Sequence, residues 1–159
     1  MKILKWLDEH FEEYVLSMLL ALISCVMMLQ VIMRYVFNSS LSWAEELSRY
    51  AFVWSAFLSI GYTIKKRTIL KVDTFVEILP KGIKKIVKIL VALTITIFFI
   101  YLFVNSLPAV NRIYLSKQIS PAMGIPMYII YSSTSIGFFL AIVRSIQSAL
   151  GIFKELWGK

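Results

Sequence analysis

The charged residues between positions 34 and 49 are the ones most able to do chemistry in this chain. The segment reads RYVFNSSLSWAEELSR. Glu45 and Arg49 are four residues apart, a spacing that lets them pair along a helix. Arg34 and Glu46 are a second candidate pair, which would join two neighbouring helices. The alternative is that Arg34 or Glu46 contacts another protein, so the segment predicts either an internal ion pair or a partner interface.

The same segment carries ordinary structural signals. Asn38 and Ser39 indicate a turn. Ser42 and Glu45 fit a capping box, S-x-x-E, at the start of the helix that follows. Trp43 is expected in the aromatic belt at the membrane surface.

The remaining sequence offers no grouping suited to catalysis or to a cofactor. Cys25 is the only cysteine and His10 the only histidine. A single thiol excludes an intrachain disulfide and gives no metal-binding spacing. We therefore expect no enzyme activity, no metal and no cofactor. A membrane thiol oxidase in particular would need pairs of cysteines.

Four long apolar runs must position the charged segment. The chain has 159 residues, of which 59% are hydrophobic and only 16% charged. An average soluble domain is about 25% charged, so a soluble globular domain is excluded. Each run reaches the roughly 20 residues needed to cross a bilayer. We expect an all-α membrane protein with one domain over residues 1–159 and four transmembrane helices, at about residues 14–33, 43–64, 89–110 and 125–143.

The distribution of basic residues predicts the orientation. Four spans place both termini and the central loop on one side, and that side would carry 13 of the 17 Lys and Arg residues. Lys and Arg accumulate on the cytoplasmic side of membrane proteins, which predicts an N-in/C-in topology. The net charge of +8 thus belongs to residues beside apolar runs, and no nucleic-acid partner is expected.

Two amphipathic segments are expected to lie flat at the cytoplasmic surface. Apolar residues recur at helical spacing within 3–14, which includes Trp6, and again within 72–79. Pro80 suits the first turn of a new helix. The basic residues after it share one face and would anchor the helix at the headgroups: Lys81, Lys84, Lys85 and Lys88. The alternative is that these segments are loops leading into the spans.

The middle of each span is uncharged. Ion-coupled transporters usually bury an acid, a base or a broken helix at the membrane midplane, whereas here Asn105 and Pro108 are the only unusual residues.

Small residues recur every four positions in three of the spans, either because they pack helices closely or because membrane helices are rich in them. The stripes are Ser17, Ala21 and Cys25; Ala51, Ser55, Ser59 and Thr63; and Ser133, Gly137, Ala141 and Ser145.

The chain resembles the small membrane subunit, of the DctQ type, of tripartite ATP-independent periplasmic (TRAP) transporters. The likeness covers essentially the whole chain. Members often carry a histidine shortly before Asp73, where this chain has Ile69. The residues that carry the resemblance are Arg34, Phe37, Leu41, Trp43, Glu45, Glu46, Leu47 and Arg49, then Lys65, Lys66, Arg67 and Asp73, and finally Gly124, Ile125 and Pro126.

The resemblance implies a non-catalytic scaffold subunit in the bacterial inner membrane, surrounded by phospholipids. Its obligate partner would be a large elevator-type membrane subunit that holds the substrate and sodium sites. A periplasmic binding protein would deliver the substrate and contact the outer face transiently. The substrate would be a carboxylate-bearing organic anion such as sialic acid or a dicarboxylate. The alternative is a self-contained four-helix transporter acting as a homodimer, although Glu12 and Glu13 lie too near the membrane edge to act as its embedded acid.

Overall fold

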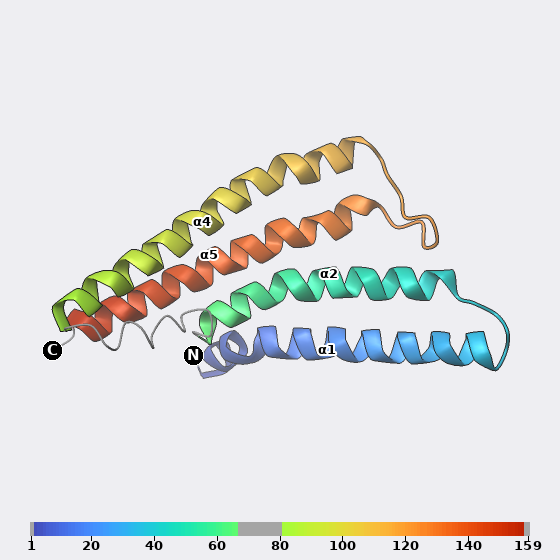
Figure 1. Ribbon diagram of the computed structural model, residues 1–159, viewed down its shortest axis with the longest axis horizontal. Helices are drawn as coiled ribbons and strands as arrows, with labels where there is room; N and C mark the ends of the chain where they lie inside the picture. The colour runs from blue at the N-terminus through green and yellow to red at the C-terminus, as the bar shows by residue number, and fades with distance from the viewer. Residues whose placement is uncertain (1, 67–80, 158–159) are drawn as a thin grey trace.

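The computed structural model describes residues 2–66 and 81–157, which form four helices (Figure 1). The helices are α1 (Lys2–Tyr35), α2 (Ser42–Lys65), α4 (Lys81–Leu115) and α5 (Met127–Trp157). Three of them contain a segment long and apolar enough to cross a membrane: His10–Tyr35, Ile86–Leu115 and Met127–Gly151. Helix α2 has 24 residues and carries three charges in its first turns.

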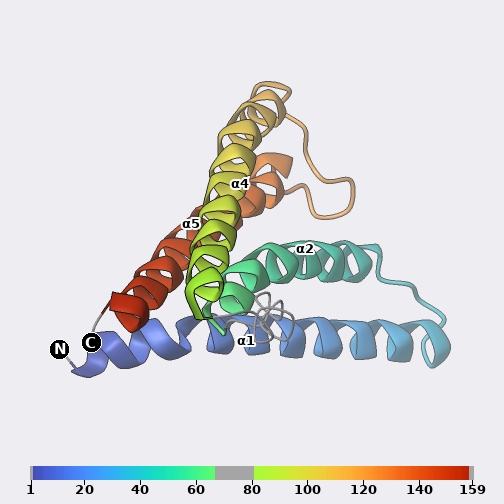
Figure 2. The ribbon, with the colours of Figure 1, turned by 60° about the vertical axis from the view of Figure 1, so that its left-hand side comes forward.

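The four helices lie in one row rather than around a common centre. Their order along the row is α4, α5, α2, α1, and within the described residues helices pack only against their neighbours in that order (Figure 1). The α1–α2 and α4–α5 pairs fan apart towards the connections 36–41 and 116–126 (Figure 2). We call this the hairpin end, and the opposite end, where both termini lie, the terminal end.

Small residues allow α2 and α5 to approach closely in the middle of the row. Gly137 of α5 lies against Phe57 of α2, and a Cβ atom at Gly137 would come within 2.7 Å of the Phe57 carbonyl oxygen. The stripe of α5 and part of the stripe of α2 are buried: Ser133, Gly137, Ala141 and Ser145, with Ala51 and Ser55. The stripe of α1 is exposed instead.

Helix α4 joins the row through apolar packing and two hydroxyl pairs with α5. Phe99 packs with Ala141 and Ile64 in the buried cluster. Thr96 and Ser145 hydroxyls lie 2.7 Å apart, and those of Ser106 and Ser135 lie 2.8 Å apart. These contacts need no charged group, as expected where lipid surrounds the helices.

The helices are longer than the predicted spans. Helix α1 runs unbroken from Lys2 to Tyr35, so segment 3–14 forms its first turns rather than a separate helix. Helix α4 begins at Lys81, directly after the predicted proline signal, and Lys88 belongs to the same continuous helix as the span. Segment 72–79 and the side chains of Trp6, Lys81, Lys84 and Lys85 lie outside the described part of the chain. Their position at the membrane surface stays a prediction.

Candidate functional site

The turn between α1 and α2 forms at the predicted residues but is capped differently. Asn38 adopts a φ of 50°, and the Ser39 amide donates to the Met33 carbonyl at 3.0 Å. The N-cap residue of α2 is Leu41, and no side chain caps the helix. The predicted Ser42–Glu45 capping box is therefore wrong, because Glu45 reaches across to α1.

A polar contact joins α1 to α2 just below this turn. Gln30 of α1 donates from Nε2 to Glu45 Oε1 at 2.6 Å, and Gln30 is only 4% exposed. Arg34 Nη2 lies 3.9 Å from the same oxygen, with both side chains about half exposed. An ion pair so exposed contributes about 0–1 kcal/mol, so the buried amide contributes more to holding the two helices in register.

The structure corrects both predicted ion pairs in this segment. Arg34 lies beside Glu45, not Glu46, so the expected staple between α1 and α2 exists with a different acid. Arg49 is exposed, and it forms no ion pair with any residue that the structure describes. Trp43 is 37% exposed near the start of α2, and its place in an aromatic belt stays a prediction.

Glu46 connects α2 to the loop between α4 and α5. Its side chain is buried, and Tyr50 donates a hydroxyl hydrogen bond to Oε1 at 2.5 Å. The backbone amides of Ala122 and Met123 each donate to Oε2 at 2.9 Å. Hydrogen bonds to a charged acceptor are among the strong ones, so this carboxylate fastens a loop 76 residues further along the chain. The contact joins the two helix pairs where they fan apart.

The loop 116–126 also has an ordered conformation of its own. Ser120 is 2% exposed, and its amide donates to the Ile125 carbonyl at 2.8 Å. The Met127 amide donates to the Gln118 carbonyl at 2.9 Å. Gly124 has a φ of +67°, a conformation that side-chain-bearing residues rarely adopt. The loop therefore presents a fixed surface at the hairpin end.

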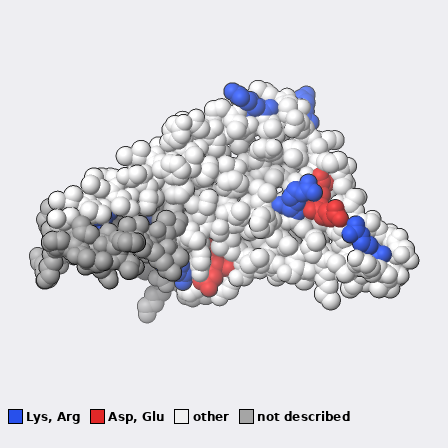
Figure 3. Space-filling view, in the orientation of Figure 1, with Lys and Arg blue, Asp and Glu red and all other residues white. Residues whose placement is uncertain are grey.

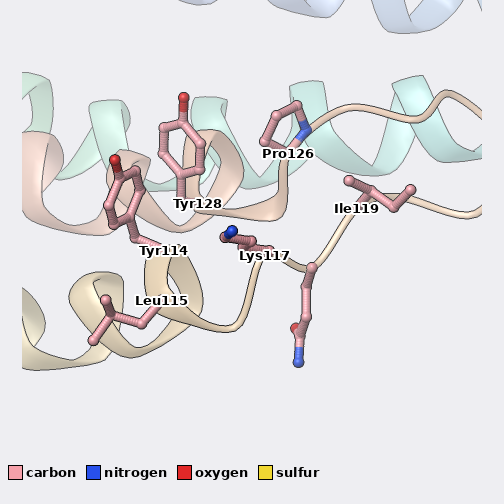
Figure 4. Close-up of a pocket in the computed structure, with 7 residues that line it drawn as sticks. Tyr114, Leu115, Lys117, Ile119, Pro126 and Tyr128 are labelled. Atoms are coloured by element: carbon pink, nitrogen blue, oxygen red, sulfur yellow. The ribbon is translucent and has the colours of Figure 1, made fainter.

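A pocket of about 370 Å³ opens beside this loop (Figure 4). Tyr114, at the end of α4, and Tyr128, at the start of α5, meet edge to face with ring centroids 5.3 Å apart. Lys117, Ile119 and other loop residues line the rest of the pocket, and Ile119 is 66% exposed. Aromatic rings with polar tips suit a surface that is partly wet and partly apolar.

The terminal end contains an ion pair between the first and last helices. Arg144 of α5 donates from Nε to Glu12 Oε1 of α1 at 2.7 Å, and the two side chains are 8% and 4% exposed. Arg144 Nη1 also donates to Gln147 at 2.7 Å. Helix α2 lies between these helices, and a Cβ atom on its Gly61 would lie 3.6 Å from the Glu12 oxygen. The two long side chains thus bridge helices that are not neighbours.

Sequence reasoning missed this pair and also missed Gln30. The sequence predicts Glu12 only to lie too near the membrane edge to be an embedded acid, and it predicts Arg144 only to be one of the basic residues on the cytoplasmic side. A usable signal existed, because charges inside long apolar helices are costly and usually pair. The separation of 132 residues between the two side chains hides their contact from any local pattern.

The polar groups at both ends hold helices and loops together. Within residues 2–66 and 81–157, no three His, Cys, Asp or Glu side chains form a group that could hold a metal. Among the described residues on the face drawn in Figure 3, the broad middle surface is uncharged and most of the charged atoms lie near the hairpin end.

Comparison with known proteins gives a consistent result over nearly the whole chain. Residues 23–155 match the family described as tripartite ATP-independent periplasmic transporters, DctQ component. The chain is 30% identical over 156 residues to the isethionate TRAP transporter permease protein DctMQ of Oleidesulfovibrio alaskensis, covering 94% of this chain and 24% of that protein. The chain thus spans about a quarter of that relative's length.

Two further relatives differ in size and in the substrate they are named for. The chain is 24% identical over 144 residues to the ectoine TRAP transporter small permease protein TeaB of Halomonas elongata, covering 91% of this chain and 75% of that protein. It is 28% identical over 102 residues to the sialic acid TRAP transporter permease protein SiaT of Haemophilus influenzae, covering 64% of this chain and 16% of that protein.

Proposed function

Because the chain belongs to the DctQ family of TRAP transporters, we propose that it is the non-conducting scaffold subunit of a sodium-driven uptake system. It is an inner-membrane transporter subunit, and its family implies a large membrane partner. The observation that carries the proposal is the arrangement of the four helices in a single row. A row has two open faces and no enclosed path between its helices.

The polar groups inside the row support a structural role. Many Ser and Thr hydroxyls within the helices bond to each other or to carbonyls of their own helix, as Ser133 does to Ile130 at 2.6 Å. The buried carboxylates of Glu12 and Glu46 lie towards opposite ends and fasten other parts of this chain. An elevator-type partner needs an immobile neighbour that resists tilting, and long helices joined at both ends provide one.

The substrate site belongs to other chains of the system in this proposal. The three relatives are named for isethionate, ectoine and sialic acid, yet all are similar to this one chain. Such variety supports a subunit that does not select the substrate. We propose a carboxylate-bearing organic anion, sialic acid or a dicarboxylate, bound by the large subunit and delivered by a periplasmic binding protein.

The proposed topology has four spans with both termini in the cytoplasm. Helix α2 is roughly 36 Å long at 1.5 Å per residue, which suffices for a span between α1 and α5. The hairpin end then faces the periplasm, and the fixed loop 116–126 is the surface that the binding protein touches. Labelling tests this orientation: in a Cys25→Ser background, Gln118→Cys should react with an impermeant maleimide in intact cells, and Lys66→Cys should not.

Assembly is the test of the proposed function. Expressed with the large permease subunit encoded beside it, the chain should purify as a one-to-one complex in detergent. The complex should take up substrate in vesicles only with a sodium gradient and the binding protein present. Failure of the two membrane subunits to purify together would contradict the proposal.

A further inference from the structure

Helix α4 carries polar residues along the side that faces away from the rest of the molecule. Thr94, Tyr101, Asn105 and Arg112 are separated by steps of seven, four and seven residues. With 3.6 residues per turn they fall within about 40° of one another around the helix axis. All four are exposed, Tyr101 by 65%. We call these four residues the α4 polar stripe.

The opposite side of α4 faces α5, and the rest of its outward surface is mostly apolar. Phe99 and Ser106 are buried against α5. Outside the stripe, and apart from Asn111 and Tyr114 near the end of the helix, the exposed large side chains of the spanning part of α4 are hydrophobic: Ile86, Leu90, Leu93, Ile97, Phe98, Ile100, Val104, Leu107 and Leu115. A narrow polar stripe therefore runs through an apolar surface on the edge helix of the row.

In the middle of the stripe, two groups have no hydrogen-bond partner among the described residues. Thr94 donates to the Leu90 carbonyl at 2.9 Å, and Asn105 donates from Nδ2 to the Tyr101 carbonyl at 2.8 Å. The Tyr101 hydroxyl and Asn105 Oδ1 make no hydrogen bond to any described residue. Lipid tails offer no partner, and an unbonded polar group in hydrocarbon is costly.

Tyr101 cannot relieve this cost by reaching the membrane surface. It lies in the middle of the apolar segment Ile86–Leu115. At 1.5 Å per residue it is about 21 Å from either end of that segment, which is further than a tyrosine side chain extends. Its hydroxyl therefore needs a partner within the hydrocarbon region.

We propose that the α4 polar stripe is the seam against which a membrane helix of the large permease subunit packs, with hydrogen-bonding side chains opposite Tyr101 and Asn105. This inference rests on the proposed function, which supplies the partner. From Thr94 to Arg112 the stripe extends about 27 Å, close to the thickness of the hydrocarbon core. Because α4 ends the row, a partner helix packs there without displacing any helix of this chain.

Two relatives of this chain are long enough to include such a helix outside the similar segment. The similar segment is only 24% of the DctMQ permease protein and 16% of the SiaT permease protein. The remaining length of those permeases has no counterpart in this chain. A partner of that kind supplies hydrogen bonds that lipid lacks, which favours it over lipid as the occupant.

Site-specific photo-crosslinking in the assembled complex tests the proposal. Tyr101 is replaced by p-benzoylphenylalanine, and Met18, 77% exposed on the other edge helix, serves as the matched control position. The stripe position should crosslink to the large subunit in membranes, and the α1 position should give at most a weak product. A crosslink to a second copy of this chain, or to lipid alone while the complex stays intact, overturns the proposal that the α4 polar stripe packs against the large subunit. It leaves the proposed function standing. Failure of the complex to form contradicts the proposed function itself.

A pair of substitutions gives a second readout. Asn105→Leu removes the hydrogen-bonding amide, whereas Val104→Leu alters a neighbouring apolar side chain. Since a hydrogen bond between membrane helices is worth about a threefold effect on average, Asn105→Leu should weaken association of the two subunits by about threefold or more. Equal association for the two variants, with both folded, overturns the proposal.

Discussion

Two buried carboxylates hold opposite ends of this molecule in different ways. At the terminal end, Glu12 faces the guanidinium of Arg144 at 2.7 Å. At the hairpin end, Glu46 faces a tyrosine hydroxyl and two backbone amides, none of them charged. The first contact joins two helices across a third, and the second joins a helix to a loop. The comparison teaches that burial alone does not tell whether an acid in a membrane helix needs a basic partner.

Loss of one charge at the terminal end should have the largest effect. Glu12→Gln leaves the buried Arg144 without its carboxylate, and breaking a buried pair in this way costs roughly 3–5 kcal/mol. Unfolding of the purified chain in mixed detergent micelles measures the change. Glu13→Gln, a neighbouring exposed acid, is the control and should change little.

The double variant Glu12→Gln with Arg144→Met sharpens this test. Neither charge remains buried alone, so we expect the unfolding free energy to recover much of the loss seen with Glu12→Gln. If Arg144→Met instead lowers the unfolding free energy of the Glu12→Gln variant by as much as it lowers that of the original chain, Glu12 and Arg144 act independently. That result would contradict the account.

The middle of the row should respond next, because both ends depend on its spacing. Gly137→Ala places a Cβ atom 2.7 Å from Phe57, and overpacking of this kind costs about 1–3 kcal/mol. Gly61→Ala is the matched control in α2, since its nearest neighbour would be 3.5 Å away. Equal stability of the two variants would mean that α2 and α5 are not in close contact at Gly137.

The hairpin end should loosen locally when its acid is altered. Glu46→Gln loses the charge that the amides of Ala122 and Met123 and the Tyr50 hydroxyl share, so hydrogen exchange of those two amides should accelerate by about tenfold. Helix α2 should stay folded, because the contact is to a loop. Glu45→Gln is the control one residue away and should leave the loop amides protected. Acceleration by both variants alike would remove the special role of Glu46.

The exposed ion pair should matter least. Arg34→Gln removes a guanidinium that lies 3.9 Å from Glu45 and is about half exposed. The expected loss of unfolding free energy is about 0–1 kcal/mol, and it should fall further in high salt. A loss above about 2 kcal/mol would contradict the account, because it would mean that Arg34 contributes as much as a buried polar contact does.

The sequence was sufficient for the four helices and for three of the apolar spans, and insufficient for the helix lengths and the side-chain pairings. Apolar runs and the Asn38–Ser39 turn are local signals, and the helices and the turn occur where these signals lie. The partners of Glu45 and Glu46 depend on how neighbouring helices rotate, which spacing within one helix does not encode. The 36–41 turn sets Glu45 opposite Gln30, so Glu46 points to the loop.

Small residues show the same division between local and long-range information. Of the two interpretations of their spacing, close packing holds for the stripe of α5 and for Ala51 and Ser55 of α2. It could not indicate that the similar stripe of Ser17, Ala21 and Cys25 is exposed. Which face of α1 meets α2 follows from the position of Gln30 and Glu12, and that was visible only once the helices were placed.

Transport by defined proteoliposomes tests the central claim most directly. Vesicles containing this chain alone should accumulate no organic anion under a sodium gradient. Vesicles that also contain the large subunit, supplied with the binding protein, should accumulate it. Uphill accumulation of any solute by this polypeptide without its partner would show that the row of helices conducts, which contradicts the account.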